Sequence, residues 1–113
     1  MTYNKIMVQP REIRLYTTAE GRIPYDEWFD SLRDINAKAK IIQRLERVSR
    51  GNFGDYRSLG EGVCELRIDY GPGYRVYFGQ AGTTIVLLLI GGDKSTQARD
   101  IRTAKDYWTD YRS

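Results

Sequence analysis

Apolar and polar residues alternate along residues 65–78, ELRIDYGPGYRVYF. One set of alternate positions is apolar or aromatic: Leu66, Ile68, Tyr70, Tyr74, Val76 and Phe78. The other set is charged or carries a hydroxyl group: Glu65, Arg67, Asp69, Arg75 and Tyr77. A period of two predicts two strands with one buried face, and the Gly-Pro-Gly at 71–73 predicts the hairpin turn between them. The polar face is either a solvated surface or a site that binds phosphate, and the alternation leaves both interpretations open.

The register of this hairpin decides which polar side chains meet. If pairing is centred on Pro72, Arg67 faces Tyr77 and Asp69 faces Arg75, with Cβ atoms about 5 Å apart. A register that differs by two residues keeps these side chains on one face, whereas a slip of one residue moves them to the other. We therefore expect the shared face more firmly than the individual pairs.

The residues before the hairpin predict one strand and two helices. Residues 12–18, EIRLYTT, alternate as a short strand. Pro24 suits the first position of a short amphipathic helix whose apolar residues fall at i, i+3, i+4 and i+7. Asp34 can cap a second helix, from Ile35 to about Arg50. The apolar stripe predicted for this second helix is Ile35, Ala39, Ile42, Leu45 and Val48.

The glycine-rich residues 51–62 predict a loop, and the end of the chain predicts a strand and a helix. Residues 84–92, TIVLLLIGG, are apolar at nearly every position, as in a strand covered on both faces. Ser95 can cap the last helix, on which Trp108 falls on the apolar stripe and, like Trp28, is expected in the core. We predict a single α+β domain over residues 1–113: an antiparallel sheet of one N-terminal strand and a three-strand meander, with two N-terminal helices and a C-terminal helix.

Composition narrows the possible chemistry. The chain has no histidine, which excludes a Ser-His or Cys-His nucleophile pair and removes the commonest general base and zinc ligand. No metal-ligand spacing is present, so we expect neither a metal nor a cofactor. The one cysteine, Cys64, lies on the apolar side of the hairpin and is expected in the core. The net charge of +3 permits nucleic-acid binding without arguing for it.

The same reading gives an expected location. The first 14 residues lack the apolar stretch of a signal peptide, and the longest apolar run, Ile85 to Ile90, is far too short to span a bilayer. We expect a cytoplasmic protein without membrane contact.

The strings GVCELRIDYGPGYRVYF and VLLLIGGDKSTQARDI resemble the RelE/ParE superfamily of bacterial toxins, and more closely its HigB-like branch of addiction-module killer proteins, which also occur in phages. The resemblance covers nearly the whole chain and implies a RelE-like fold. It also implies a toxin of a type II toxin–antitoxin system, neutralised by a cognate helix-turn-helix antitoxin through which the complex binds operator DNA.

Three functions stay open within this resemblance. RelE-type members are endoribonucleases (mRNA interferases) that cut mRNA, typically in the ribosomal A site, and so inhibit translation and arrest growth. ParE-type members poison DNA gyrase without nuclease activity. A degenerate toxin kept as an antitoxin-bound corepressor would show no toxicity at all.

The resemblance also assigns residues. Arg67, Arg75 and Lys94 match basic residues of the nuclease branch. RNA cleavage without a metal uses the ribose 2′-OH as nucleophile, and two arginines can hold the phosphate oxygens through paired N–H donors. The sequence departs from both groups. RelE has lysines two and four residues before the position of Arg67, where this sequence has Glu65 and Val63. Many HigB-type toxins have a catalytic histidine, and this sequence has none. The acid and base are therefore sought in Glu65 and Tyr77, both on the polar face of the hairpin.

Further RNA contacts are expected from two helices. The second helix carries Lys38, Arg44 and Arg47 outside its apolar stripe, either as a solvated face or as a surface that attracts a polyanion. The first turns of the last helix contribute Gln97 and Asp100, which are also possible proton-transfer groups.

Overall fold

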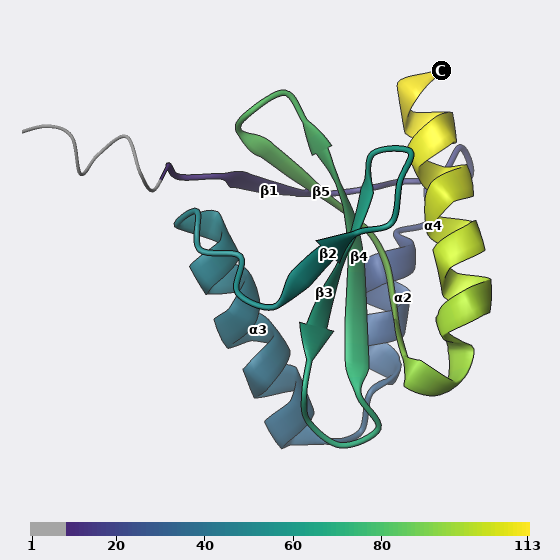
Figure 1. Ribbon diagram of the computed structural model, residues 1–113. Coiled ribbons are helices and arrows are strands. Elements are labelled where there is room, and N and C mark those ends of the chain that lie inside the picture. Colours follow the sequence, from purple (N-terminus) through teal and green to yellow (C-terminus); the bar gives the residue numbers. More distant parts are fainter. Residues whose placement is uncertain (1–8) are drawn as a thin grey trace, which may run out of the picture.

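The computed structural model describes residues 9–113 (Figure 1). Residues 1–8, which belong to the stretch inspected for a signal peptide, lie outside the described residues. The elements follow in the order β1 (Glu12–Leu15), α2 (Pro24–Ser31), α3 (Ile35–Ser49), β2 (Tyr56–Ser58), β3 (Val63–Ile68), β4 (Tyr74–Ala81), β5 (Ile85–Asp93), the 3-10 turn η1 (Lys94–Thr96) and α4 (Gln97–Arg112). None of the helices described combines the length and the apolar character that crossing a membrane requires.

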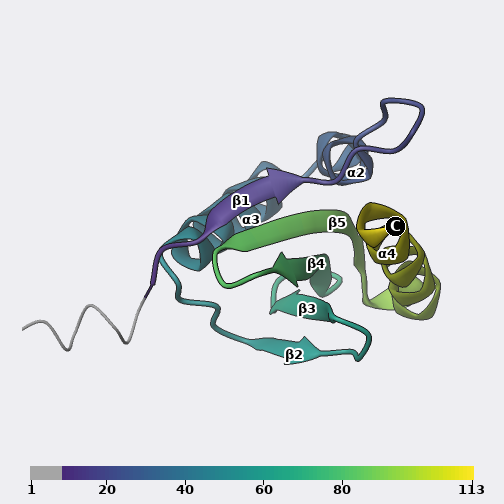
Figure 2. The ribbon, with the colours of Figure 1, turned by 90° about the horizontal axis from the view of Figure 1, so that it is seen from above.

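The strands form one five-stranded mixed sheet in the order β1-β5-β4-β3-β2 (Figure 2). Strands β2 to β5 pair antiparallel, whereas β1 runs parallel to β5, with Ile13 beside Val86. The prediction of a four-stranded antiparallel sheet is therefore wrong. Alternation in residues 12–18 identified a strand, but it carries no information about the direction of the neighbouring strand.

The expected element order is wrong as well. Strand β2 lies inside residues 51–62, which were expected to form a loop, and the two helices predicted as N-terminal lie between β1 and β2. All three residues of β2 are exposed, and its single aromatic residue, Tyr56, is too little to form an alternating pattern that would reveal the strand.

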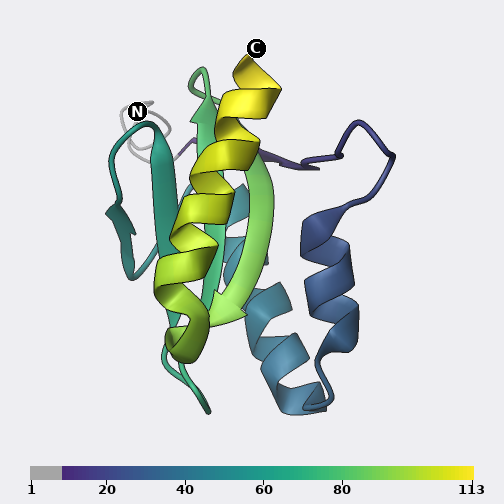
Figure 3. The same ribbon diagram turned by 90° about the vertical axis from the view of Figure 1, so that its right-hand side faces the viewer.

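Helices cover both faces of the sheet. Helices α2 and α3 pack on the face that carries Leu66, Val76 and Phe78, and α4 packs on the opposite face. Figure 3, seen from the side of α4, shows this helix in front of the sheet, running roughly along the strands. Leu88 of β5 belongs to the core under α2 and α3, and Leu89 belongs to the core under α4. This confirms the prediction that the strand is covered on both sides.

Several local predictions are confirmed. Asp34 caps α3, because its Oδ1 accepts hydrogen bonds from the backbone N–H groups of Asn36 at 2.9 Å and Ala37 at 3.2 Å. Pro24 opens α2. Cys64 and Trp108 are buried in the two cores.

Two predictions about helices are wrong. The apolar stripe of α3 agrees with the prediction only in the second half of the helix, where Val48 is buried and Leu45 packs against the core. In the first half it is rotated: Ile35 is 79% exposed, whereas Ala37, Ile41 and Arg44 face the interior. At the start of the last helix, Asp93 rather than Ser95 acts as the cap, since its Oδ1 accepts from the backbone N–H of Ser95 at 2.8 Å. This cap begins η1, and α4 follows from Gln97.

Candidate functional site

The β3–β4 hairpin presents its polar side chains on one face, as predicted, but in a different register. Arg67 pairs with Arg75 and Glu65 with Tyr77, which is two residues from the expected pairing of Arg67 with Tyr77. The turn is centred on Gly71 rather than Pro72, and a shift of two residues preserves the face. Arg67 and Arg75 are therefore direct cross-strand neighbours.

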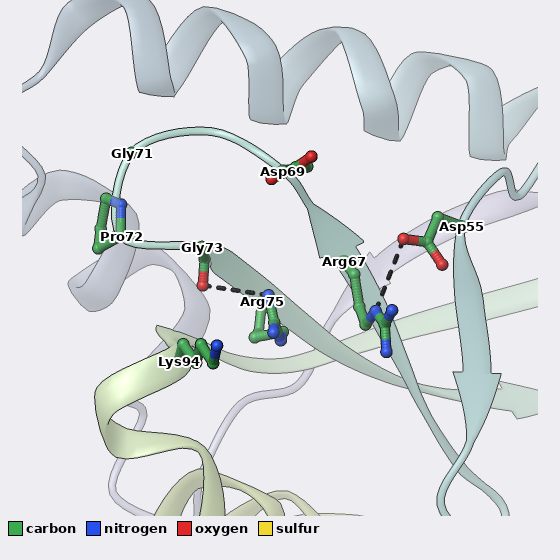
Figure 4. A pocket seen from close by; sticks show the side chains of 8 residues that line it. All are labelled: Asp55, Arg67, Asp69, Gly71, Pro72, Gly73, Arg75 and Lys94. Carbon is green, nitrogen blue, oxygen red and sulfur yellow. Dashed lines mark hydrogen bonds and ion pairs between the residues drawn. The ribbon is translucent and has the colours of Figure 1, made fainter.

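A cavity of about 410 Å³ lies at the turn end of this hairpin (Figure 4). We call it the cation pocket, and its lining is Asp55, Arg67, Asp69, Gly71, Pro72, Gly73, Arg75 and Lys94. The three predicted cations come from β3, β4 and η1, and the structure brings them together around this cavity. Its volume lies within the ordinary range of sites for small molecules, about 300–1,000 Å³.

Arg75 is the most firmly held of the three cations. Its side chain is only 12% exposed, and its Nη1 donates to the backbone carbonyls of Gly73 at 3.2 Å and Tyr74 at 3.3 Å. Its Nε lies 3.9 Å from Oε2 of the buried Glu65. The left-handed backbone of Gly73, with φ of 82°, places its carbonyl where the guanidinium can reach it. Arg75 is thus oriented before any ligand binds.

The side chains of Arg67 and Lys94 are held by fewer contacts than that of Arg75. The Nε of Arg67 lies 3.6 Å from Oδ2 of Asp55, and both side chains are exposed. Lys94 and Asp69 are exposed, and neither forms an ion pair with another residue of the described chain. The cross-strand pair between Asp69 and Arg75 that would have made this an ordinary solvated face is not formed.

Glu65 and Tyr77, the predicted proton-transfer groups, lie beneath the cavity and not in its lining. Glu65 is fully buried: its Oε1 accepts from Nε of Arg57 at 3.0 Å and its Oε2 from Nε2 of Gln97 at 2.8 Å. Tyr77 is also fully buried, and burial, followed by the neighbouring charge of Glu65, raises the pKa of its phenol. Both residues are buried in the sheet under α4, and burial keeps them from reaching a substrate in the cavity. The carboxylate oxygens of Glu65 are already engaged, whereas the hydroxyl of Tyr77 has no hydrogen-bond partner among the described residues.

Gln97 and Asp100 hold the start of α4 against the sheet. Gln97 binds Glu65, and Asp100 is 4% exposed, with its Oδ2 accepting from Oγ1 of Thr96. Asp100 sits so close to the sheet that a Cβ on Gly92 would lie 1.9 Å from its Oδ2. Asp100 is therefore too buried for the predicted RNA contact, whereas Gln97 is half-buried and its RNA contact stays a prediction.

The cations predicted on α3 do not join the cation pocket. Helix α3 packs on the opposite face of the sheet, where the ammonium nitrogen of Lys38 lies 5.2 Å from the ring centroid of Phe29, and Arg47 is exposed. Arg44 was expected on a solvent-facing surface, and this is wrong: its side chain is 7% exposed. Burial lowers the pKa of its guanidinium from the ordinary value.

Arg44 instead ties the loop at residues 53–55 to strand β3. Its Nε donates to the carbonyl of Phe53 at 3.0 Å, its Nη1 to that of Arg67 at 2.7 Å, and its Nη2 to that of Asp55. The backbone N–H of Arg67 also donates to the carbonyl of Asp55 at 3.0 Å. Arg44 thus fixes the backbone on which the Asp55–Arg67 ion pair is built.

Sequence reasoning missed Asp55, Asp69 and Arg57. Asp55 precedes the unexpected strand β2 and Arg57 lies in it, so neither was placed next to the hairpin. Asp69 was noticed only as a possible partner of Arg75. Among the described residues, no group of three or more histidine, cysteine, aspartate or glutamate side chains is arranged to hold a metal ion.

Comparison with known proteins adds a relative but no activity. No family model matches the sequence. The chain is 51% identical over 83 residues to a Haemophilus influenzae protein described as "Uncharacterized protein", and the match covers 74% of this chain and 84% of that protein.

Proposed function

Because the chain belongs to the same family as this Haemophilus influenzae protein, whose description states no activity, we propose a function from the site itself: a metal-independent endoribonuclease that cleaves mRNA on the ribosome as the toxin of a type II toxin–antitoxin system. The observation that carries the proposal is the gathering of Arg67, Arg75 and Lys94 around one cavity large enough for a nucleotide. The toxin assignment itself rests on the resemblance of the hairpin and β5 sequences to the HigB-like branch.

The pairing of Arg67 with Arg75 supports an anionic ligand. Like charges directly opposite each other on neighbouring strands destabilise a sheet. The two nearby carboxylates compensate only in part, since Asp55 lies 3.6 Å from Arg67 and Glu65 lies 3.9 Å from Arg75. A phosphate between the two guanidinium groups would remove the repulsion and accept paired N–H donors.

The reaction follows from the chemistry of RNA. The ribose 2′-oxygen forms a bond to the adjacent phosphorus, and the bond from phosphorus to the 5′-oxygen breaks. The products are a 2′,3′-cyclic phosphate and a 5′-hydroxyl. A base removes the 2′-OH proton, an acid protonates the 5′-oxygen, and Arg67 and Arg75 stabilise the negative charge that develops on the phosphorane.

The lining of the cavity suggests the two proton-transfer groups. Asp55 is engaged with Arg67, whereas Asp69 is an exposed carboxylate without an ion pair in the described chain, so we assign Asp69 as the base. Lys94 is the one ammonium group in the lining and is assigned as the acid that protonates the leaving 5′-oxygen. This replaces the sequence-based assignment to Glu65 and Tyr77, which are buried below the cavity.

The partners and location belong to the same proposal. A cognate helix-turn-helix antitoxin would neutralise the toxin and carry the complex to operator DNA, and the substrate would be mRNA in the ribosomal A site. Such a toxin acts in the cytoplasm and needs no membrane.

Brief induction in bacteria, followed by mapping of mRNA 5′ ends, tests the proposal. New 5′-hydroxyl ends within coding sequences are expected within minutes, together with arrest of translation. Arg75→Ala should abolish both effects, whereas Arg47→Ala, an exposed arginine on the opposite face, should leave them unchanged. Growth arrest without new RNA ends, accompanied by altered DNA supercoiling, would contradict the nuclease and favour a gyrase poison.

A further inference from the structure

A second cavity, of about 400 Å³, lies at the opposite end of α4 from the cation pocket. We call it the aromatic pocket, and its lining is Gly62, Gln80, Ala81, Gly82, Trp108, Tyr111 and Arg112. The connections β2–β3 and β4–β5, the end of β4 and the last turns of α4 contribute these residues. The reaction proposed above makes no use of this cavity.

The side chains of the aromatic pocket suit a planar ligand. The rings of Tyr111 and Trp108 are stacked, with centroids 5.6 Å apart and an interplanar angle of 17°. Trp108 is 5% exposed, whereas Tyr111 is 41% exposed and offers an accessible ring face. The guanidinium carbon of Arg112 lies 5.7 Å from the Trp108 ring centroid. An exposed aromatic ring beside an arginine is the combination that stacks a nucleobase while the cation attracts its phosphate.

A buried polar atom at this cavity also lacks a partner. The indole Nε1 of Trp108 is buried without a hydrogen-bond acceptor among the described residues. It faces Gly62, where a Cβ would lie 2.6 Å from this nitrogen. A buried donor without an acceptor costs stability, so a ligand oxygen or a water molecule at this point would be favoured.

The two cavities lie at a spacing that a short RNA strand can cover. Arg75 lines the cation pocket and Gln80 the aromatic pocket, five residues further along β4, which corresponds to about 17 Å. The path along α4, from Lys94 to Trp108, corresponds to about 21 Å. Such a distance fits about four nucleotides, the low end of known single-strand binding sites.

Strand β2 supplies a cation between the cavities. The segment from Asp55, in the cation pocket, to Gly62, in the aromatic pocket, contains Arg57, whose side chain is 50% exposed. The buried Glu65 holds the Nε of Arg57 at 3.0 Å and thereby fixes its direction. Negative charges also lie here: Glu65 is paired with Arg57, Glu61 is exposed beside Gly62, and Asp110 accepts the hydrogen bond of Tyr16.

We propose that the aromatic pocket is a second subsite for single-stranded RNA, in which one nucleobase stacks on Tyr111 about four nucleotides from the phosphate held in the cation pocket. The inference rests on the proposed function for the class of its ligand. Arg57 and Arg112 contact the intervening phosphates, so affinity increases with the length of the RNA until both cavities are occupied.

Nuclear magnetic resonance titration with uncleavable RNA tests this subsite. The probes are 2′-O-methyl oligoadenylates of two and six nucleotides, which lack the attacking hydroxyl. The dinucleotide should shift the signals of the cation pocket alone. The hexanucleotide should also shift the indole N–H of Trp108, whereas the indole N–H of Trp28, which packs on the other face of the sheet, should not move.

Variants make the test quantitative. Tyr111→Ala should weaken hexanucleotide binding roughly tenfold or more, as for other stacked bases, and leave dinucleotide binding unchanged. Tyr56→Ala removes a tyrosine of similar exposure, 45% against 41%, whose ring packs with Phe78 on the other face, and it should change neither affinity. Arg112→Ala should weaken hexanucleotide binding more than Arg102→Ala, which removes an equal charge outside the cavity lining.

The outcomes separate this inference from the proposed function. Equal hexanucleotide affinity for the wild type and Tyr111→Ala, or shifts confined to the cation pocket, would overturn the subsite and leave the nuclease intact. Shifts at both cavities without new RNA ends in cells would remove the nuclease and retain an RNA-binding surface. Failure of both oligonucleotides to shift the cation pocket would overturn both.

Discussion

Replacing Arg44 with alanine tests whether this buried cation holds the functional site together. The change removes the donors to the carbonyls of Phe53, Asp55 and Arg67. A buried acceptor without a partner costs about 1–3 kcal/mol. The carbonyl of Asp55 keeps its hydrogen bond from the backbone N–H of Arg67, so two carbonyls lose their side-chain donor. Taking the lower end of this range for each, we expect a loss of about 2 kcal/mol in the free energy of unfolding. For a domain of this size, that corresponds to a decrease of about 8 °C in Tm.

Urea unfolding followed by tryptophan fluorescence measures this loss. Arg47→Ala is the matched control, because Arg47 lies one turn further along α3 and is exposed, and we expect a change within about 0.5 kcal/mol. Arg44→Lys keeps the charge but not the forked geometry, so its stability should lie between those of the wild type and Arg44→Ala. Equal free energies of unfolding for Arg44→Ala and Arg47→Ala would refute the structural role and restore Arg44 as a candidate for RNA contact.

Three further predictions follow from other contacts. Arg67→Ala should leave the free energy of unfolding unchanged or raise it by about 0.5 kcal/mol, because it removes the repulsion from Arg75. The same variant should lower the cleavage rate on the order of 10²–10³-fold. Loss of both stability and activity would contradict this prediction. Burial and the hydrogen bond to Asp110 raise the pKa of Tyr16 from its ordinary 10 to about 12, so its stabilising effect is complete below pH 10 and is lost as the pH rises to 12. Urea unfolding at several pH values in this window should therefore show a shallower decrease for Tyr16→Phe than for the wild type, and equal slopes would contradict the assignment. Gly79→Ala should lower stability by about 1–3 kcal/mol, because a Cβ there would lie 2.3 Å from the Trp108 ring, and a Tm equal to that of the wild type would show that Trp108 can move aside.

The alternation in the hairpin was enough to predict which side chains share the polar face. A period of two assigns each side chain to a face, and any even shift of register preserves that assignment. Arg67 and Arg75 therefore share a face although their pairing partners were predicted wrongly. The register itself depends on the turn, where the centre at Gly71 rather than Pro72 could not be distinguished from the Gly-Pro-Gly sequence alone.

The errors have physical causes that a single sequence does not display. Strand β2 is an edge strand of three exposed residues, so its pairing with β3 is made by the backbone and leaves no apolar pattern. The phase of α3 was misjudged because a helix face that contains an arginine was assumed to face solvent. Arg44 is buried because three backbone carbonyls, two from the loop at 53–55 and one from β3, surround its guanidinium, and the fold brings these carbonyls together.

Some residues that line the cation pocket could be predicted from the sequence, and others are there only because of the fold. Arg67, Arg75 and Lys94 were predicted from the sequence, whereas Asp55 joins them only because β2 pairs with β3. Glu65 was predicted as a base because it shares the face of Arg67. The packing of α4 over that part of the face buries Glu65 and leaves the turn end open.

The cleavage rate of a defined mRNA on purified, stalled ribosomes, measured at a saturating concentration of the protein, tests the central claim most directly. The account predicts 5′-hydroxyl products and a decrease on the order of 10²–10³-fold for each of Arg67→Ala, Arg75→Ala and Lys94→Ala, with Tm close to that of the wild type. Wild-type rates in all three variants, or no cleavage by the wild-type protein itself, would contradict the claim that these cations act together on one phosphate.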